Sequence, residues 1–296
     1  MDATDATTLY AELDRRSAAV AEQVIAWRRH LHRHPELSNR EGATAELIAG
    51  HLTSLGLDEV RTGIAGHGVV GVLRGGRPGG RVVALRADTD ALPVADLCGT
   101  DFASSAVDRD YPGGPFPVSH ACGHDGHTAM LLGAATVLAG VREQLPGTVL
   151  FVFQPAEEGP PVTEAGGARQ MLAEHALDDP EPTMVFGMHL TPHPKGHVGY
   201  RAGNQYAASC LVKITVTGRQ VHGSTPGRAS TRCRPPPRSS PASASSTASS
   251  TPTTRSPSPS ATSRTSAAST SSASASPSGA PSAAPSRATW PTSSGA

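Results

Sequence analysis

The sequence predicts an α/β fold: a three-layer sandwich in which a largely parallel sheet lies between layers of helices. Three observations support this class. Four short, continuous apolar runs are typical of strands buried on both faces, and they occupy residues 69–73, 82–85, 149–153 and 184–188. Amphipathic stretches with helical spacing precede and separate these runs. Large aliphatic side chains also stop at Val221, which confines the core to the front of the chain.

The helices are predicted from apolar spacing and from residues that end a helix. Residues 9–33 carry apolar side chains at helical intervals and end before Pro35. Residues 41–56 form a second such stretch, closed by Gly56. Two more helices are expected near residues 126–140 and 165–177, between the apolar runs. Residues 208–217 alternate between apolar and polar side chains, so they are predicted to form a half-exposed strand that begins a second domain.

The charges divide the chain into two parts. The 296 residues have a net charge of zero, but the last 68 contain six arginines and no other charged residue. The segment 229–296 also lacks Val, Ile, Leu, Met, Phe and Tyr, so it cannot bury enough apolar surface to offset the entropy of ordering it. We expect three regions. Residues 1–200 form an incomplete α/β catalytic domain, residues 201–228 begin a smaller α+β domain, the lid, and residues 229–296 form a disordered tail.

Composition excludes several classes of partner and location. Residues 1–228 have a net charge of −6, which gives no reason to expect nucleic acid as a partner. No run of 18 apolar residues occurs, so no membrane-spanning helix is expected. The acidic N-terminus does not resemble a signal peptide, and the four cysteines are sparse and irregularly spaced. These features predict a cytoplasmic protein with reduced thiols.

Polar side chains follow the predicted strands directly. Asp88 and Asp90 follow the run 82–85, Glu157 and Glu158 follow 149–153, and His189 follows 184–188. The segment 120–127 contains Cys122 and three histidines and leads into the helix at 126–140. Because reactive groups gather at the carboxyl ends of strands in an α/β sheet, these clusters are expected to converge. Together they supply the thiolate, imidazole and carboxylate groups that bind transition metals.

Each cluster by itself also has a simpler interpretation. A single cysteine such as Cys122 is usually a small buried apolar residue, and an isolated histidine is usually a hydrogen-bonded core residue. Asp88 and Asp90 are also explained by a helix or turn cap. A binding module with one structural metal is a further alternative, but structural zinc sites usually have two close ligand pairs. The sequence has one such pair, Cys122 and His124.

At these residues the sequence resembles a known family. The chain is similar to the amidohydrolases typified by hippurate hydrolase and indoleacetyl-amino-acid hydrolase, within the aminoacylase–carboxypeptidase metallopeptidases. The matching stretches occur in family order, and they are residues 28–38, 85–93, 120–130, 153–159, 187–190 and 222–224.

The resemblance implies a role for each matching residue. It implies a two-metal site for Mn or Zn, with Co or Ni as further possibilities, and a Cys122 thiolate that bridges the two ions. Glu157 matches the general base that takes a proton from the attacking water. Asp90 matches an aspartate that supports the metal centre, and His222 matches a substrate-binding histidine of the lid. The implied metal ligands are Cys122, His124, Glu158 and His189.

The implied reaction is hydrolysis of an N-acyl amino acid to a carboxylic acid and a free amino acid. No nucleic acid or membrane is expected as a partner, and intact family members form homodimers through the lid. They also supply one more histidine ligand near the C-terminus, whereas no histidine follows His222 here. The alternative expectation is therefore an inactive fragment that lacks the last ligand and most of the lid.

The composition of residues 229–296 has two interpretations. A GC-rich gene read in a shifted frame tends to give Ser, Thr, Ala, Pro and Arg, so this segment fits an out-of-frame reading of the same gene. A genuine disordered tail, or a Ser/Thr/Pro-rich stalk, is the other interpretation. The lack of a signal peptide argues against a stalk.

Overall fold

The computed structural model describes residues 3–207, 218–219, 222, 224 and 230–231. The chain separates into two units, Met1–Lys195 and Gly196–Ala296, and each is considered by itself. The expected boundaries at 200 and 228 remain predictions. The strand expected at 208–217 lies outside the described residues, as does almost all of the expected tail.

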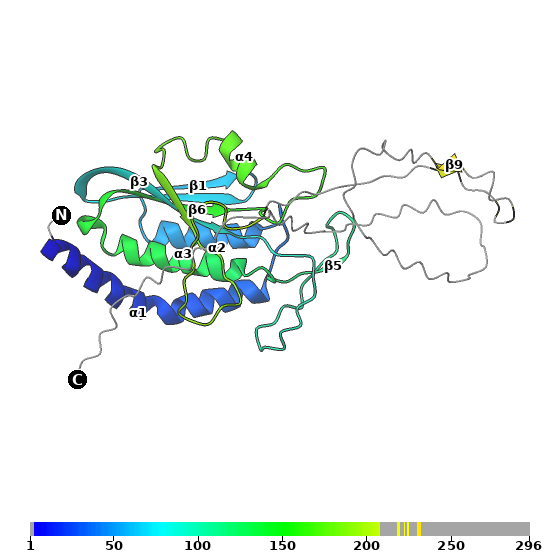
Figure 1. Cartoon of the computed structure of the whole chain (residues 1–296), viewed down its shortest axis with the longest axis horizontal. Coiled ribbons are helices and arrows are strands. Elements are labelled where there is room, and N and C mark those ends of the chain that lie inside the picture. The colour runs from blue at the N-terminus through cyan, green and yellow to red at the C-terminus, as the bar shows by residue number, and fades with distance from the viewer. Residues whose placement is uncertain (1–2, 208–217, 220–221, 223, 225–229, 232–296) are drawn as a thin grey trace, which may run out of the picture. The chain divides into compact units, whose positions relative to one another are not determined.

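The first unit is built on a five-stranded mixed sheet with the order β1-β2-β6-β3-β7 (Figure 1). Its strands are β1 (Glu59–Ile64), β2 (Gly68–Arg74), β3 (Arg77–Asp88), β6 (Pro146–Gln154) and β7 (Met184–Gly187). β3 is parallel to both β6 and β7, whereas β2 is antiparallel to β1 and β6. The sheet is therefore less parallel than expected, because the short connections around β2 reverse the chain without a helical crossover.

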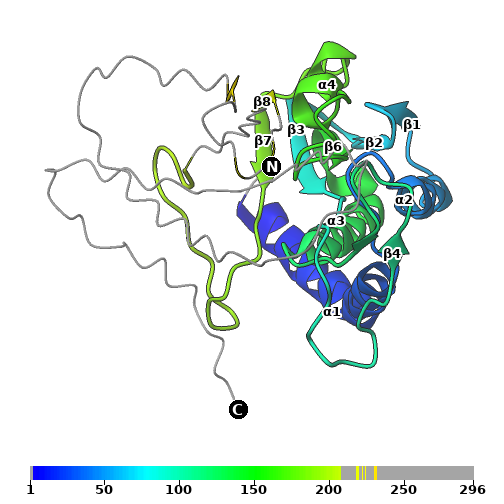
Figure 2. The ribbon, with the colours of Figure 1, turned by 90° about the vertical axis from the view of Figure 1, so that its right-hand side faces the viewer.

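Helices cover the two faces of the sheet unequally. The helices α1 (Ala3–Arg33), α2 (Gly42–Ser54) and α3 (His124–Ala139) lie on one face, and the short α4 (Gly167–Ala173) lies on the other (Figures 1 and 2). The larger core cluster joins α2 and α3 to the sheet through residues such as Leu52, Leu132 and Phe151. A smaller cluster packs Met171 of α4 against Val152 and its neighbours. The expected three-layer sandwich is thus present, with one thin layer.

Smaller elements complete the described residues. A 3-10 turn, η1 (Arg142–Gln144), precedes β6, and the short strands β4 (Val107–Asp108) and β5 (Phe116–Pro117) pair with each other. In the second unit, β8 (Gly218–Arg219) pairs antiparallel with β9 (Ser230–Thr231). None of the helices among the described residues has both the length and the apolar character that a bilayer-spanning segment needs.

The four predicted helices and the four apolar runs correspond to observed elements. The short strands β4, β5, β8 and β9 were not predicted, and two further differences concern β1 and β7. β1 was not predicted, because half of its six residues are polar and the strand is only partly buried, so it forms no continuous apolar run. The run at 184–188 was expected to be buried on both faces, but Met184, Val185 and Phe186 of β7 are each at least 50% exposed. β7 is an edge strand that pairs only with β3 among the described residues, which leaves its other edge and much of its surface uncovered.

Candidate metal centre

The four polar clusters predicted from the sequence meet at one end of the parallel strands. Asp88 is the last residue of β3, Glu157 and Glu158 follow β6, and His189 follows β7. His124 is the first residue of α3. Parallel strands bring their carboxyl ends to the same sheet edge, so residues far apart in sequence become neighbours there.

His124 lies at the centre of this cluster and is completely buried. Its Nδ1 is 3.3 Å from Asp90 Oδ1, a pairing that orients the imidazole ring. The other ring nitrogen, Nε2, faces carboxylate oxygens, at 3.6 Å from Glu158 Oε1 and 3.8 Å from Glu157 Oε2. A histidine held by a carboxylate on one side and directed at acidic oxygens on the other has the orientation of a metal ligand.

Asp90 connects three segments of the chain. Its Oδ2 accepts hydrogen bonds from the Ser38 hydroxyl at 2.6 Å and from the Glu158 backbone N–H at 3.0 Å. Its Oδ1 contacts His124. Burial alone would raise the pKa of Asp90, but these hydrogen bonds, above all that of His124, lower it below its ordinary value. Asp90 is therefore an ionised side chain that fixes the position of its neighbours.

Cys122 and His189 approach each other beside His124. The Cys122 Sγ is 3.4 Å from His189 Nε2, and one donor atom from each of these three residues lies within 4.8 Å of the others. Gly123 separates Cys122 from His124 with a φ of 90°, a left-handed conformation that favours glycine. This turn directs both side chains to the same side at the start of α3.

The electrostatics of the cluster favour a bound cation. Burial by itself would lower the pKa of His124, but Asp90, Cys122 and Asp88 raise it to about 11. The cluster therefore stabilises positive charge where His124 Nε2 lies. His124 Nε2 and Glu158 Oε1 are also buried without a hydrogen-bond partner. Unpartnered nitrogen and oxygen atoms beside a thiol fit divalent transition metals, so these residues are suited to the ions that the sequence implied.

Asp88 and His127 form a pair that sequence reasoning did not assign. The backbone N–H of Leu190 donates to His127 Nε2 at 2.8 Å, so His127 Nδ1 carries the proton and donates to Asp88 Oδ1 at 2.6 Å. Arg86 donates to the other Asp88 oxygen at 2.7 Å. Asp88 thus has partners for both oxygens. The sequence feature that could have marked His127 as part of the site is its place as the third histidine of the segment 120–127.

Glu41 is a second residue that the sequence did not reveal. Its side chain is fully buried, and its Oε1 accepts the backbone N–H of Ala156, next to Glu157. Burial raises the pKa of Glu41 to about 7, while the hydrogen bond from Ala156 opposes this shift. A glutamate before an apolar helix resembles an ordinary solvent-exposed residue in the sequence, so no local pattern marked it.

His222 belongs to the second unit. Its Nδ1 is 2.8 Å from the Ser224 hydroxyl, and the Ser224 backbone N–H also points to this atom. Its expected contact with substrate stays a prediction.

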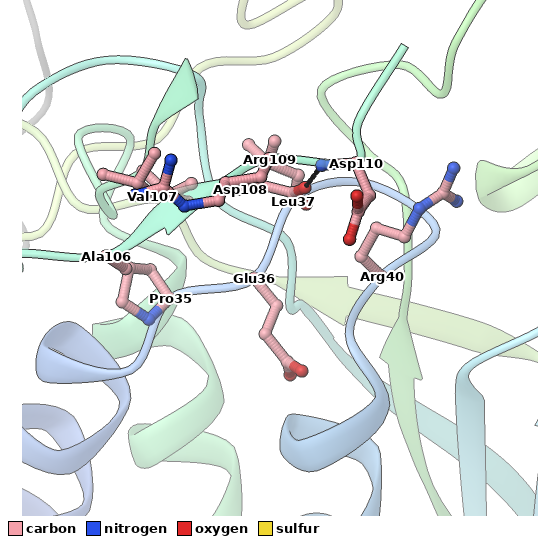
Figure 3. A pocket seen from close by; sticks show the side chains of 10 residues that line it. Pro35, Glu36, Leu37, Arg40, Ala106, Val107, Asp108, Arg109 and Asp110 are labelled. Atoms are coloured by element: carbon pink, nitrogen blue, oxygen red, sulfur yellow. Dashed lines mark hydrogen bonds between the residues drawn. The ribbon is translucent and has the colours of Figure 1, made fainter. Parts of the chain in front are cut away.

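A separate cavity of about 380 Å³ lies along the loop between α1 and α2 and contains none of the proposed metal ligands (Figure 3). Two of its charged side chains, Arg40 and Glu36, have partners in the protein. Arg40 pairs with Glu164 at 2.9 Å, and Glu36 accepts the backbone N–H groups of Ala43 and Thr44 at the start of α2. The lining residues are Pro35, Glu36, Leu37, Arg40, Ala106, Val107, Asp108, Arg109, Asp110 and Val118.

The fold and the cluster together define an α/β protein with a group of candidate metal ligands at the carboxyl ends of its strands. Residues 84–288 match the protein family described as peptidase family M20/M25/M40. The chain therefore belongs to this family.

Individual relatives agree with this assignment. The chain is 42% identical over 216 residues to an N-acyl-L-amino acid amidohydrolase of Geobacillus stearothermophilus, covering 73% of this chain and 54% of that protein. It is 38% identical over 212 residues to the IAA-amino acid hydrolase ILR1-like 2 of Arabidopsis thaliana, covering 71% and 44%. The chain spans about half the length of the curated relatives it matches first.

A solved structure shows the same fold. The YXEP protein of Bacillus subtilis, described as a dinuclear metal-binding peptidase of the M20 family, superposes with a TM-score of 0.50 and 39% identity. The match covers 59% of this chain and 44% of that one.

Proposed function

We propose that this chain carries the catalytic machinery of an amidohydrolase that cleaves N-acyl amino acids with two divalent metal ions. The observation that carries the proposal is the environment of His124, whose Nδ1 is held by Asp90 while Nε2 faces Glu157 and Glu158. The name of the Geobacillus stearothermophilus relative supports the substrate class.

In this proposal the side chains divide the work between binding metal and moving a proton. Cys122, His124, Glu158 and His189 hold the ions, and Asp90 fixes the ring of His124. Bound divalent ions supply Lewis-acid polarisation of the scissile carbonyl and lower the pKa of water. Glu157 has a side chain that is 41% exposed, so it can accept a proton from water and deliver it to the leaving amine. His222 would contact the substrate.

The test is a joint measurement of metal content and turnover on the full chain. After incubation with Mn²⁺, we expect two ions per chain and release of glycine from N-benzoylglycine. Glu157→Gln should reduce turnover by about 10²–10⁴-fold while the metal content stays at two ions, because Glu157 moves a proton and binds no metal. Turnover that is insensitive to this substitution would contradict the assigned role.

A second candidate is an inactive relative of such an enzyme. It is favoured by the lack of any histidine after His222, since the resemblance implies one more metal ligand. This candidate predicts fewer than two tightly bound Mn²⁺ ions and no turnover. A dipeptide with a free carboxylate is a useful further substrate, because another relative is named thermostable carboxypeptidase 2.

We also propose that the sequence after about residue 229 is the same gene read out of frame. The abrupt loss of large aliphatic residues supports this idea. The family match itself continues to residue 288, which favours a real tail. The nucleotide sequence across codons 226–232 tests this proposal. If a single-base shift there restores an open frame with family-like sequence and a late histidine, the proposal stands. If no such shift exists, the proposal fails.

We propose a cytoplasmic location from the sequence composition, with no nucleic acid or membrane as a partner. A homodimer is what the resemblance implies for intact relatives, and the oligomeric state of this chain is the point to measure. Sedimentation of the purified chain measures the oligomeric state, and cell fractionation tests the location.

A further inference from the structure

A second cluster of metal-binding side chains lies outside the candidate metal centre and shares no ligand with it. His32, in the last turn of α1, meets Asp96 and Cys98 in the loop that follows β3. His32 Nε2 is 3.1 Å from Asp96 Oδ2 and 3.9 Å from Cys98 Sγ. One donor atom from each of the three residues lies within 4.8 Å of the others.

The ring of His32 is oriented by a buried carboxylate. Its Nδ1 lies 2.8 Å from Asp125 Oδ2, and the side chain of Asp125 is only 1% exposed. His32 also makes an edge-on contact with the ring of Phe102 at a centroid distance of 5.4 Å. A histidine that donates from one nitrogen to a carboxylate presents the other nitrogen to a metal, an arrangement common among metal-ligating histidines.

Asp96 and Cys98 are held in place by the backbone of their own loop. Asp96 Oδ1 accepts the backbone N–H of Cys98 at 2.9 Å, and Asp96 Oδ2 accepts that of Ser104 at 2.8 Å. Hydrogen bonds from the Cys98 side chain and backbone lower the pKa of Asp96 well below its ordinary value, so this carboxylate is ionised. Asp96 and His32 have side chains that are 5% and 11% exposed, while Cys98 is exposed and leaves the cluster open to solvent.

The separations suit one tetrahedral ion. Zinc lies about 2.0–2.1 Å from histidine nitrogen and about 2.3 Å from cysteine sulfur, which places tetrahedral ligand atoms roughly 3.3–3.6 Å apart. The observed 3.1 and 3.9 Å bracket that range. We propose that His32, Asp96 and Cys98 form a second, solvent-open site for a single Zn²⁺ ion, with water as the fourth ligand. The competing account is a purely structural bridge in which His32 links Asp96 to Asp125.

Protection of Cys98 from alkylation separates the two accounts. The full chain is freed of metal, incubated with or without Zn²⁺, and treated with iodoacetamide, and each cysteine is then quantified by peptide mass spectrometry. We expect Zn²⁺ to slow alkylation of Cys98 at least about tenfold, because a bound thiolate is withdrawn from reaction. The structural bridge predicts the same alkylation rate with and without Zn²⁺, and that result would overturn the site.

Substitutions make the test specific. Cys98→Ser should remove one Zn²⁺ equivalent without changing the melting temperature, since Cys98 is exposed. Asp96→Asn should weaken zinc protection of Cys98 by at least about tenfold. Asp101→Asn, in the same loop, is the matched control and should retain full protection. An unchanged zinc content in Cys98→Ser would refute the proposal. Because each cysteine is quantified separately, failure of the metal centre at Cys122 would not affect the result at Cys98.

Discussion

At the scale of single residues, His127 controls where a proposed metal ligand lies. His127 Nε2 accepts the backbone N–H of Leu190, the residue that follows His189. The rings of His127 and His189 are also 4.7 Å apart. The side chain of Leu190 also lies directly against Gly126 of α3. His189 is exposed, and its position depends on these contacts.

The two hydrogen bonds of His127 can be removed separately. In His127→Gln, the amide oxygen replaces Nε2 and keeps the bond from Leu190. In His127→Asn, the amide nitrogen replaces Nδ1 and keeps only the bond to Asp88. We expect His127→Asn to weaken metal binding by about 10–100-fold, while His127→Gln stays close to the native affinity. Chelator-competition titrations with Zn²⁺ measure the metal affinity of each variant. Equal affinities in His127→Asn and His127→Gln would contradict the role of His127 in positioning His189.

Glu41 is expected to make stability depend on pH. Its folded pKa of about 7 lies above the ordinary value of 4.5, so its neutral form stabilises the fold. That contribution is complete below pH 4.5 and is lost as pH rises through 7. The free energy of unfolding of Glu41→Gln, relative to the native chain, should rise by on the order of 1 kcal/mol per pH unit across this window.

Urea denaturation of metal-free protein at several pH values measures this difference. Glu46→Gln is the control, because it changes an exposed carboxylate on the same helix. A difference between Glu41→Gln and the native chain that does not vary with pH would show that Glu41 is ionised throughout.

At the scale of elements, α2 begins with a cap that comes from outside the helix. The residue that precedes it, Glu41, makes no side-chain cap. Glu36, which is labelled in Figure 3, accepts the N–H groups of Ala43 and Thr44 at 3.1 and 2.8 Å. Glu36→Ala should lower the free energy of unfolding by about 1 kcal/mol, because two backbone donors lose their acceptor. Glu46→Ala on the same helix should change it little. Thermal or urea unfolding distinguishes the two.

Elements were predictable where one physical signal dominated. The apolar spacing of α1 to α3 and the buried runs of β2, β3 and β6 reflect burial that the sequence records directly. β1 is half exposed and depends on its pairing with β2, so it left no such signal. The reversal of direction at β2 was also missed, because apolar runs do not indicate which neighbour a strand will pair with.

At the scale of the whole molecule, the metal centre depends on contacts between segments remote in sequence. The convergence of the candidate ligands after the strands could be predicted, because strand ends converge in this fold class. The contacts that support them could not be predicted. The Ser38 hydroxyl donates to Asp90, 52 positions away in the sequence, and Glu41 accepts the backbone N–H of Ala156, 115 positions away. Such pairs carry no local periodicity, so only the folded chain reveals them.

Within the part of the chain that the structure describes, one edge of β7 is unpaired, and we expect this edge to make the chain self-associate. Met184, Val185 and Phe186 are exposed at a sheet edge, and exposed apolar edges favour pairing between molecules. We expect the apparent mass in light scattering to rise with protein concentration, and Val185→Lys to reduce this rise. Val162→Lys, at an exposed apolar loop residue, is the control and should have little effect. A chain that stays monomeric at all concentrations would refute this expectation.

The place of β7 in the chain also sets the order of events during synthesis. The ribosome makes Cys122 and His124 well before His189, and at about 5–20 residues per second several seconds pass between them. During that interval the sheet from β1 to β6 can assemble, while the nascent protein still lacks one proposed ligand. If the chain binds the two proposed ions, complete binding would therefore follow emergence of β7, and metal supplied after translation should load the protein as fully as metal supplied during it.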